Sequence, residues 1–332
     1  MTSGLLVVDK PGGITSHQVV ARARRALGLK KVGHAGTLDP MATGVLVLGI
    51  GRGTRLLGHL ALTTKTYRAT IRLGQATDTD DADGTVVSAS GSTLTGVGPA
   101  LGVELAALTG AIAQVPSSVS AIKVDGQRAY ARVRRGEEVT LAAREVTVTR
   151  FDALDVRAAD ADGTPVVDVD VVVDCSSGTY IRALARDLGA ALGVGGHLTA
   201  LRRTAVGPFR VEHATWDAHL GELAPGQRVE LHLYPLGAIA PLCFVTVEVD
   251  AAAAADVAVG RPLPLRLDAD PTAVLHDGEL LALYRPDGDG ARPVAVLTAP
   301  GDAPAGGQTA GAVADRETER DAVVFRRDPE AR

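Results

Sequence analysis

Hydrophobic and polar positions alternate along the chain in a pattern that predicts short strands separated by helices. Residues 4–9 form an apolar run that ends at a Pro-Gly-Gly segment, which is typical of a buried strand followed by a turn. Residues 18–27 continue with helical periodicity, and Thr15 or Ser16 precedes them as a candidate helix cap. Residues 66–73 alternate apolar and polar side chains, which predicts a strand with one buried face.

The rest of the first 240 residues continues this mixture. The patterns predict helical segments at 54–62, 103–108, 127–135 and 180–192, and strands at 145–154, 166–175 and 198–206. Residues 43–49 form an apolar run, and residues 85–100, rich in Ser, Thr and Gly, are predicted to be a connecting segment. These elements do not form the regular strand–helix–strand repeat that a parallel sheet would require. The sequence therefore predicts an α+β domain over residues 1–240, built on a largely antiparallel or mixed sheet.

A change of pattern near Pro241 predicts a second, smaller unit. Short apolar strands at 244–249, 273–276, 280–284 and 293–298 are separated by turns rich in Gly, Pro and Asp. This pattern predicts a small β-rich module over residues 241–299. Residues 300–332 are rich in Ala, Gly, Asp and Glu and are predicted to be disordered.

Composition excludes several classes of protein. The chain has 332 residues, of which 46% are hydrophobic, and only two cysteines, which excludes a disulfide scaffold and a CxxC zinc site. No apolar run reaches the roughly 18 residues that a transmembrane helix needs. The first residues also lack the basic and apolar regions of a signal peptide. We therefore expect a cytoplasmic protein without a membrane partner.

The net charge of −5 hides an uneven distribution. Residues 241–332 carry 9 basic and 16 acidic residues, whereas residues 1–60 carry 8 basic and 2 acidic ones. Residues 120–150 and 180–212 each have a net charge of +3. A polyanion responds to such local patches more than to the total charge, although ordinary solvated faces would give the same counts. The first 240 residues are thus compatible with a nucleic-acid partner.

One loop gathers several groups that could carry chemistry. Residues 33–46 contain His34, three glycines, and Asp39 followed by Pro40. Proline restricts the residue before it to extended conformations, and glycine lets a ligand approach the backbone closely. Such a loop would hold the Asp39 carboxylate rigidly in front of a ligand. The alternative from this loop alone is an Asp-Pro turn with a structural histidine.

Two further segments, 65–84 and 175–182, combine polar and aromatic groups. Tyr67 fits a strand core, and Arg182, near a helix start, suits either solvent or a two-pronged contact with a carboxylate. The eight histidines form no HExxH or HxxxH pair, and the sequence has no GxGxxG or GxxxxGK[ST] loop. We therefore expect neither a metal nor a cofactor.

Four signatures, in order, resemble the TruB family of tRNA pseudouridine-55 synthases. They are Lys10-Pro11-x-Gly13-x-Thr15-Ser16; Gly33-His34-Ala35-Gly36-Thr37-Leu38-Asp39-Pro40-x-Ala42-Thr43-Gly44; Lys65-x-Tyr67 with Leu73-Gly74-x-x-Thr77-Asp78-Thr79-x-Asp81; and Gly178-Thr179-Tyr180-Ile181-Arg182 followed by Leu201-Arg202-Arg203-Thr204. The resemblance implies a pseudouridine-synthase-like catalytic domain with a central mixed or antiparallel sheet. It also implies that residues 241–299 are a PUA-like RNA-binding module, whose acidic balance does not favour strong phosphate binding.

The same resemblance implies a reaction, the isomerisation of uridine 55 in the TΨC loop of tRNA to pseudouridine. The N1–C1′ bond breaks, the base turns, and C5 joins C1′, without a cofactor. Asp39 matches the family's catalytic aspartate, which acts as a nucleophile or starts an elimination at the ribose. Arg182 matches the arginine that pairs with this carboxylate. Tyr67 matches a tyrosine that stacks on the uracil and assists removal of the C5 proton.

Other matching residues surround the implied site. Lys10 matches a lysine that braces the catalytic loop, and Asp81 matches an acid near the target nucleotide. Tyr180 and Leu201 match residues that wall the pocket. His34 matches the histidine that fills the space left in the RNA loop when the target base is extruded.

RNA contacts are implied outside the pocket as well. Residues 123–146, with Lys123, Arg128 and Arg132, resemble an insertion that closes over the RNA, and Arg202 is a further candidate for RNA binding. The expected partner is the TΨC stem-loop of tRNA, bound by a monomer. Two alternatives stay open: a catalytic subunit of a guide-RNA particle, and an RNA chaperone without catalytic activity.

Overall fold

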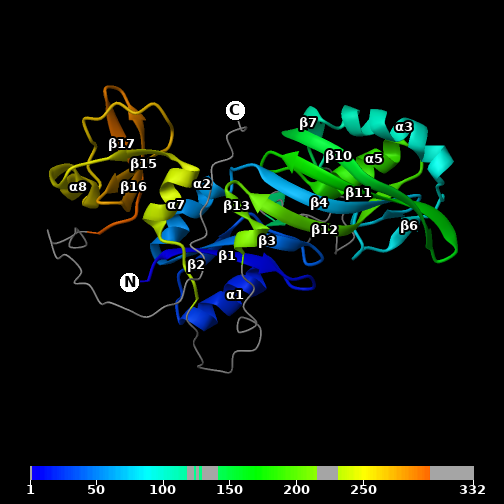
Figure 1. Ribbon diagram of the computed structural model, residues 1–332, viewed down its shortest axis with the longest axis horizontal. Helices are drawn as coiled ribbons and strands as arrows, with labels where there is room; N and C mark the ends of the chain where they lie inside the picture. The colour runs from blue at the N-terminus through cyan, green and yellow to red at the C-terminus, as the bar shows by residue number, and fades with distance from the viewer. Residues whose placement is uncertain (1, 118–122, 125–126, 129–140, 215–230, 300–332) are drawn as a thin grey trace, which may run out of the picture.

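Two β-sheets organise the chain. The computed structural model describes residues 2–117, 123–124, 127–128, 141–214 and 231–299, and for 123–124 and 127–128 it gives the backbone only. A nine-stranded sheet runs through the larger part of the molecule, and a four-stranded sheet lies at one end of its long axis (Figure 1).

The nine-stranded sheet joins strands that are far apart in the sequence. Its strands are β1 (Gly4–Lys10), β2 (Val32–Ala35), β3 (Thr43–Ile50), β4 (Lys65–Leu73), β7 (Gly110–Gln114), β10 (Arg144–Ala161), β11 (Thr164–Cys175), β12 (Gly196–Val206) and β13 (Phe209–Arg210). They lie in the order β1-β3-β12-β4-β11-β10-β7, with β2 beside β3 and β13 beside β12. Only β3 and β12 are parallel among these pairs. The predicted α+β fold with a mixed sheet is confirmed.

Most predicted helices are present, with different bounds in places. The helices of this part are α1 (Ser16–Leu27), the 3₁₀ helix η1 (Gly51–Leu56), α2 (Leu57–Leu60), α3 (Leu94–Ala107), α5 (Ile181–Ala191) and the 3₁₀ helix η2 (Val211–His213). Thr15 caps α1: its hydroxyl accepts from the Gln18 amide at 3.1 Å, and the Gln18 side chain accepts from the Thr15 amide at 2.7 Å. Here the sequence prediction is correct.

Two segment predictions are wrong. Residues 85–100 are not a plain connection, because β6 (Val86–Ser88) pairs with β5 (Ala76–Thr77) and α3 begins at Leu94. The helix forms despite its glycines and proline because Val97, Leu101 and Leu105 pack into the main core. The helix expected at 127–135 starts instead as β9 (Gln127–Arg128), paired with β8 (Lys123–Val124). An Asp-Gly pair separates the two in the sequence, as is typical of hairpins.

Helices cover the two halves of the large sheet differently. Helices α3 and α5 cover one face of the half formed by β4, β10, β11 and β12 (Figure 1). Helix α1 packs against one face of β1 and β3 through residues such as Val19 and Ala23, which contact Leu6 and Leu48 in one buried cluster. The opposite face of β1 and β3 contributes to a separate cluster with residues of the C-terminal part.

The C-terminal part is built on the four-stranded sheet. Its elements are α7 (Leu236–Cys243), β14 (Val245–Glu248), α8 (Ala251–Ala258), β15 (Thr272–His276), β16 (Glu279–Asp287) and β17 (Gly290–Val296), with the strands in the order β14-β15-β16-β17. The predicted β-rich character is therefore correct. Leu275 and Leu283 share a buried cluster with Val7 and Val47 of the large sheet. The division predicted after residue 240 falls within α7.

The junction of β3 and β12 brings the two halves of the large sheet together. Only two residue pairs connect these strands, Thr43 with Arg202 and Gly44 with Arg203. Gly44 has φ +100, and a Cβ there would lie 2.1 Å from the Arg203 carbonyl oxygen, so no other residue fits without a backbone shift. The loop that carries Asp39 enters β3 at this junction, which places it at the centre of the sheet.

Within the described ranges, the structure contains no helix that is both long enough and apolar enough to cross a membrane.

Candidate active site

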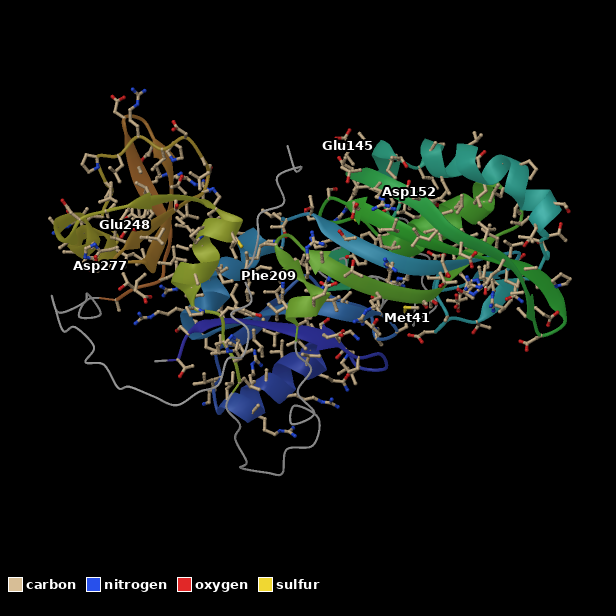
Figure 2. All side chains as sticks on the ribbon, in the orientation of Figure 1. Met41, Glu145, Asp152, Phe209, Glu248 and Asp277 are labelled. Carbon is tan, nitrogen blue, oxygen red and sulfur yellow. The ribbon has the colours of Figure 1, made fainter. Side chains whose placement is uncertain are left out.

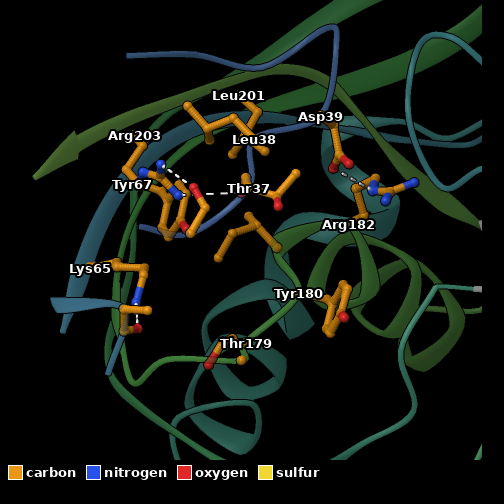
Figure 3. A pocket seen from close by; sticks show the side chains of 14 residues that line it. Thr37, Leu38, Asp39, Lys65, Tyr67, Thr179, Tyr180, Arg182, Leu201 and Arg203 are labelled. Atoms are coloured by element: carbon orange, nitrogen blue, oxygen red, sulfur yellow. Dashed lines mark hydrogen bonds and ion pairs between the residues drawn. The ribbon is translucent and has the colours of Figure 1, made fainter. Parts of the chain in front are cut away.

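A pocket of about 280 Å³ opens beside the β3–β12 junction (Figure 3). Five parts of the chain line it: the loop before β3, the end of α2, strand β4, the start of α5 with the loop before it, and strand β12. The lining residues are Gly36, Thr37, Leu38, Asp39, Ala61, Lys65, Tyr67, Gly178, Thr179, Tyr180, Ile181, Arg182, Leu201 and Arg203. Five of the predicted site residues thus meet in one cavity: Asp39, Tyr67, Tyr180, Arg182 and Leu201.

Asp39 and Arg182 form an ion pair at the rim of this pocket. Arg182 Nε lies 3.1 Å from Asp39 Oδ2, and the arginine side chain is 5% exposed whereas the aspartate side chain is 38% exposed. Arg182 Nη1 lies 3.2 Å from Asp81 Oδ2 and donates to the Thr79 carbonyl at 3.0 Å. The buried guanidinium therefore holds two carboxylates, of which only Asp39 is accessible to a ligand.

The surroundings of Asp39 raise its pKa above the ordinary carboxyl value. Burial is the largest cause, and the negative charge of Asp81 acts in the same direction. The positive charges of Arg182 and Lys10 oppose both effects. A carboxylate in such a position is less well solvated than one in water, which makes it a better nucleophile once a substrate has excluded the remaining water.

Two buried side chains fix the backbone of the loop around Asp39. Lys10 is fully buried, and its ammonium group donates to the carbonyls of Pro11, Ile14 and Pro40 at 2.9, 2.7 and 3.2 Å. Burial lowers the pKa of Lys10 to about 8. The Ser16 hydroxyl donates to the Leu38 carbonyl at 3.0 Å and accepts from the Leu38 amide at 2.9 Å. Both residues adjoining Asp39 are thus held in place.

Tyr67 reaches the pocket from β4 and is only 7% exposed. Burial raises the pKa of its phenol, whereas the positive charge of Arg203 acts in the opposite direction. The hydroxyl is therefore protonated at neutral pH. Its ring and that of Tyr180 offer flat apolar surfaces that could hold a base.

Arg203 and Lys65 line the pocket but were not singled out as site residues in the sequence. Arg203 is 1% exposed, and its guanidinium donates to the carbonyls of Val45, Gly36 and Thr37 at 2.8, 3.0 and 3.5 Å. Lys65 donates to the carbonyls of Ala61 and Thr63 at 2.9 and 2.8 Å, and burial lowers its pKa to about 8. The alternation of β4 and β12 would have indicated both, because each lies two residues from another pocket residue on the same strand.

His34 does not line this pocket. It lies on β2, with its ring centroid 5.4 Å from that of His17, and its buried Nδ1 has no hydrogen-bond partner within the described part of the chain. Burial lowers the pKa of His34, and the neighbouring charges of His17 and Arg203 lower it further. The ring is therefore neutral at pH 7.

The predicted RNA-binding residues lie apart from the pocket or outside the described residues. Arg202 pairs with Asp9, with Nη2 and Oδ2 2.7 Å apart. It points away from the pocket because neighbouring residues of a strand face opposite sides. Lys123 and Arg128 are described by their backbone alone, in β8 and β9. Arg132 lies outside the described residues, as does most of the predicted insertion at 123–146.

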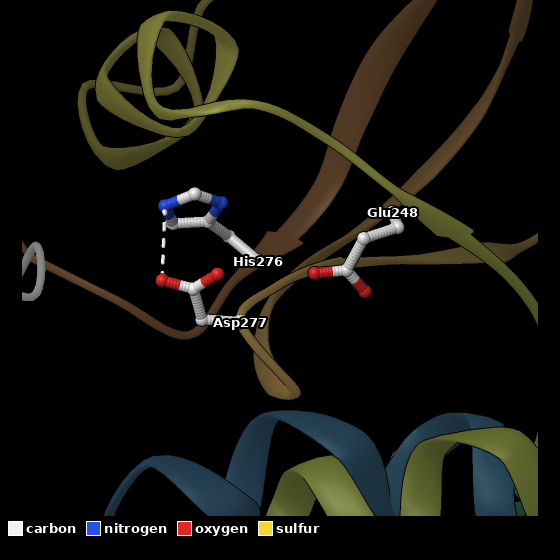
Figure 4. A group of neighbouring side chains, drawn as sticks. All are labelled: Glu248, His276 and Asp277. Atoms are coloured by element: carbon white, nitrogen blue, oxygen red, sulfur yellow. Dashed lines mark ion pairs between the residues drawn. The ribbon is translucent and has the colours of Figure 1, made fainter. Parts of the chain in front are cut away.

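Among the described residues, one group has donor atoms close enough together to hold a metal ion. Glu248, His276 and Asp277 lie in the C-terminal part (Figure 4), far along the molecule from Met41, which follows the Asp39 loop (Figure 2). His276 Nε2 lies 3.7 Å from Asp277 Oδ2, and both carboxylates are exposed. The group lies far from Asp39 along the molecule, so it cannot take part in chemistry at the pocket (Figure 2).

Comparisons with known proteins agree with this geometry. Residues 24–181 match the model of the "TruB family pseudouridylate synthase (N terminal domain)". Residues 182–224 match the "tRNA pseudouridylate synthase B C-terminal domain", and residues 244–298 match "tRNA Pseudouridine synthase II, C terminal". Two similar relatives are named tRNA pseudouridine synthase B. That of Nocardia farcinica is 57% identical over 296 residues, covering 89% of this chain and 93% of the relative. That of Streptomyces griseus is 54% identical over 290 residues, covering 86% and 90%.

Solved structures show the same fold. A chain from an H/ACA RNP bound to a substrate RNA containing 2′-deoxyuridine has a TM-score of 0.62 at 23% identity, covering 89% of this chain and 85% of that one. A chain from a Cbf5–Nop10–Gar1 complex has a TM-score of 0.60 at 25% identity, and the match again covers 89% of this chain and 85% of that one. The fold is that of a pseudouridine synthase, an enzyme that isomerises uridine to pseudouridine in RNA. Within that class, the chain belongs to the TruB family.

Proposed function

We propose that this enzyme acts on uridine 55 in the TΨC loop of tRNA, by flipping the base into the pocket and exchanging its glycosidic bond with the help of Asp39. The observation that carries the proposal is the accessible Asp39 carboxylate, paired with a buried arginine and facing a pocket lined by Tyr67 and Tyr180. The names of the relatives, which are 52 to 57% identical over most of the chain, support the choice of tRNA.

The reaction needs no atom from outside the nucleoside except protons. The N1–C1′ bond breaks, either by attack of the Asp39 carboxylate on C1′ or by an elimination that Asp39 starts at the ribose. The freed uracil turns and forms the C5–C1′ bond, any ester to Asp39 breaks, C5 loses its proton, and N1 gains one. Tyr67 would stack on the base during this turn, and its hydroxyl would relay the C5 proton by giving its own proton to solvent as it takes up the one from C5.

Arg182 and Asp81 prepare the carboxylate for this step. When a base fills the pocket and excludes water, an unpaired carboxylate would take up a proton. The guanidinium 3.1 Å from Asp39 keeps it ionised, and the contact of Arg182 with Asp81 fixes the guanidinium in the required orientation. Lys10 and Ser16 hold the loop rigid, so that little reorganisation is needed during the reaction.

Recognition of RNA is assigned mainly to residues 1–240, as the catalytic domain, because the basic patches lie there. Extruding a base costs a few kcal/mol, which stacking in the pocket and entry of His34 into the vacated space would offset. Lys123, Arg128, Arg132 and Arg202 would bind the RNA backbone. We assign residues 241–299 to a PUA-like accessory domain, and expect a monomer that works in the cytoplasm.

The decisive experiment replaces Asp39 by Asn, which keeps the size of the side chain and removes its charge. Release of tritium from tRNA labelled at uridine C5 should be abolished, whereas filter binding of the same tRNA should be nearly unchanged, because most contacts lie outside the pocket. Asp152→Asn is the matched control, since it removes an exposed aspartate that pairs with Arg150 away from the site. Normal turnover in Asp39→Asn would exclude Asp39 as the catalytic residue.

The same experiment separates the two other candidates. If the protein were a chaperone without catalytic activity, the wild-type chain would release no tritium, as expected for Asp39→Asn. A subunit of a guide-RNA particle would be inactive until a guide RNA was added. Tritium release by the purified chain alone, from one uridine of tRNA, would distinguish the proposed enzyme from both.

A further inference from the structure

Gln114, the last residue of β7, makes an unusual contact with the start of α5. Its side chain is 2% exposed, and both of its polar atoms bond to the backbone of one residue, Tyr180. Oε1 accepts from the Tyr180 amide at 2.8 Å, and Nε2 donates to the Tyr180 carbonyl at 3.1 Å. The amide thus pairs with Tyr180 as a neighbouring β-strand would, and it does not reach the pocket itself.

The position of Tyr180 explains why such a contact matters. Tyr180 is the N-cap of α5, yet its side chain makes no capping bond, because the ring lines the pocket. A helix start without a capping side chain has fewer restraints on its backbone. Gln114 supplies the missing restraint from another strand.

A second contact fixes the same side of α5. The carbonyl of Val115, the residue after Gln114, accepts from Arg186 Nη2 at 2.8 Å. Arg186 lies four residues after Arg182, so both are on one face of the helix. The end of β7 therefore contacts α5 at its first turn and again one turn later.

The placement of Arg182 depends on this restraint. Arg182 is the second residue of α5, and its guanidinium must lie between Asp39 at 3.1 Å and Asp81 at 3.2 Å. A shift of the first turn of α5 would move both the Tyr180 ring and the Arg182 guanidinium away from the reacting base.

We propose that Gln114 is a positioning residue of this enzyme: its side-chain amide fixes the backbone of Tyr180 and thereby places Tyr180 and Arg182 for the reaction. The inference rests on the roles proposed above for Asp39 and Arg182. Gln114 touches neither substrate nor Asp39, so it acts on the rate of the chemical step through the geometry of α5.

The first test is Gln114→Leu, which keeps the approximate size of the side chain and removes both hydrogen bonds. A displacement of about 1 Å near a reacting centre can lower a rate about 100-fold, so the single-turnover rate should fall by about 10- to 100-fold. The affinity for tRNA should change by less than about threefold, because the phosphate contacts are unaffected. Gln75→Leu is the control, since Gln75 is also buried but lies outside the pocket and contacts neither Tyr180 nor α5 through its side chain.

The second test uses pH. Protonated Glu at position 114 has the shape of Gln and can form both bonds, whereas the ionised form has no donor for the Tyr180 carbonyl. Because burial raises the pKa of a carboxyl group, the rate of Gln114→Glu relative to the wild type should be highest at acid pH and should fall as pH rises. The same ratio for Gln114→Leu should not depend on pH. Because an ionised glutamate in a buried position also destabilises the fold, thermal unfolding of Gln114→Glu at each pH is the check that the protein is folded where the ratio is compared.

The outcomes are distinct. Single-turnover rates of Gln114→Leu within about twofold of wild type, or a ratio for Gln114→Glu that does not change with pH, would overturn the proposal. If Gln114→Leu does not fold, as judged by thermal unfolding, the pH ratio of Gln114→Glu decides alone. Asp39→Asn is measured in the same series: if it turns over normally, the catalytic assignment has failed, and if it is inactive while Gln114→Leu is normal, only the role of Gln114 has failed.

Discussion

The ionisation of Asp39 depends first on its burial and then on two charged neighbours, Arg182 and Asp81. Asp81 raises the pKa of Asp39, and the Arg182 guanidinium lowers it, while burial favours the protonated form. The reaction requires the carboxylate, so activity must fall as pH drops through this raised pKa. We expect the acidic limb of kcat/KM to lie above the ordinary carboxyl value of about 4.

Asp81→Asn tests this balance. The substitution removes a negative charge next to Asp39 and one of the two carboxylates that pair with Arg182, so the acidic limb should move to lower pH. The plateau of kcat/KM at higher pH should also fall, because Arg182 loses the contact with Asp81 that orients it. The pH at the midpoint of the acidic limb is therefore the quantity to compare. Asp83→Asn is the control. Asp83 also raises the pKa of Asp39, but it is the smallest of the causes, so removing its charge should move the midpoint less. A midpoint that moves to higher pH would contradict the electrostatic account.

The Tyr67 hydroxyl can be tested apart from its ring. Tyr67→Phe keeps the stacking surface and removes only the hydroxyl, so tRNA should bind normally. If the hydroxyl takes part in removal of the C5 proton, the single-turnover rate should fall strongly, and Tyr67→Leu should lose both rate and affinity. Tyr284→Phe is the matched control: it removes a buried hydroxyl that donates to the Arg261 carbonyl at 2.7 Å, away from the pocket. An unchanged rate in Tyr67→Phe would assign the proton transfer to another group.

The sequence identifies a functional residue only when a motif or a regular alternation of side chains points to it. Arg202 and Arg203 stand side by side in one motif, yet one pairs with Asp9 and the other is buried at the pocket. Alternation along β12 places Arg203 on the same side as Leu201, but the sequence does not show that the pairing of β12 with β3 and β4 brings that side to Asp39. Gln114 could not be found either, since its partner lies 66 residues away.

At the scale of the element, α1 stabilises the catalytic loop through its first turn. Thr15 caps the helix, and Ser16 holds the backbone of Leu38 next to Asp39. Thr15→Ala should reduce the free energy of unfolding by about 1 kcal/mol, measured by chemical denaturation, because the Gln18 amide loses its acceptor. Thr15→Ser keeps the hydroxyl and should retain most of the stability. Equal destabilisation by both variants would show that the cap is not the cause.

The elements that the sequence predicts well are those with local signals. Helix α1 has its cap and its periodicity within 13 residues, Thr15 to Leu27, and strands β4 and β11 have regular or continuous apolar patterns. Only the last part of α3 is predicted, at 103–108, because its three glycines and Pro99 are poor helix formers and its stability comes from packing against the sheet. Contacts between distant segments, such as the two-residue junction of β3 and β12, leave no local signal.

At the scale of the whole molecule, charge is divided along the chain. Residues 1–240 carry a net charge of +2 and residues 241–332 a net charge of −7. The strongly basic segment 1–60 contains the loop of Asp39, so the electrostatic attraction for RNA is centred near the pocket. The C-terminal sheet shares a buried cluster with β1 and β3, and its acidic balance points to a supporting role rather than to phosphate binding.

The division of charge gives a prediction about binding. The affinity for tRNA should fall as salt rises, with a slope set by the number of phosphates that residues 1–240 neutralise. Deleting residues 300–332 removes 5 basic and 7 acidic residues, so it should leave that slope and the turnover rate nearly unchanged. Filter binding at several salt concentrations, with the full chain and with the shortened one, measures both. A loss of affinity or rate of more than about tenfold would show that this acidic segment contributes directly, and a flat salt profile would mean that shape and stacking dominate recognition.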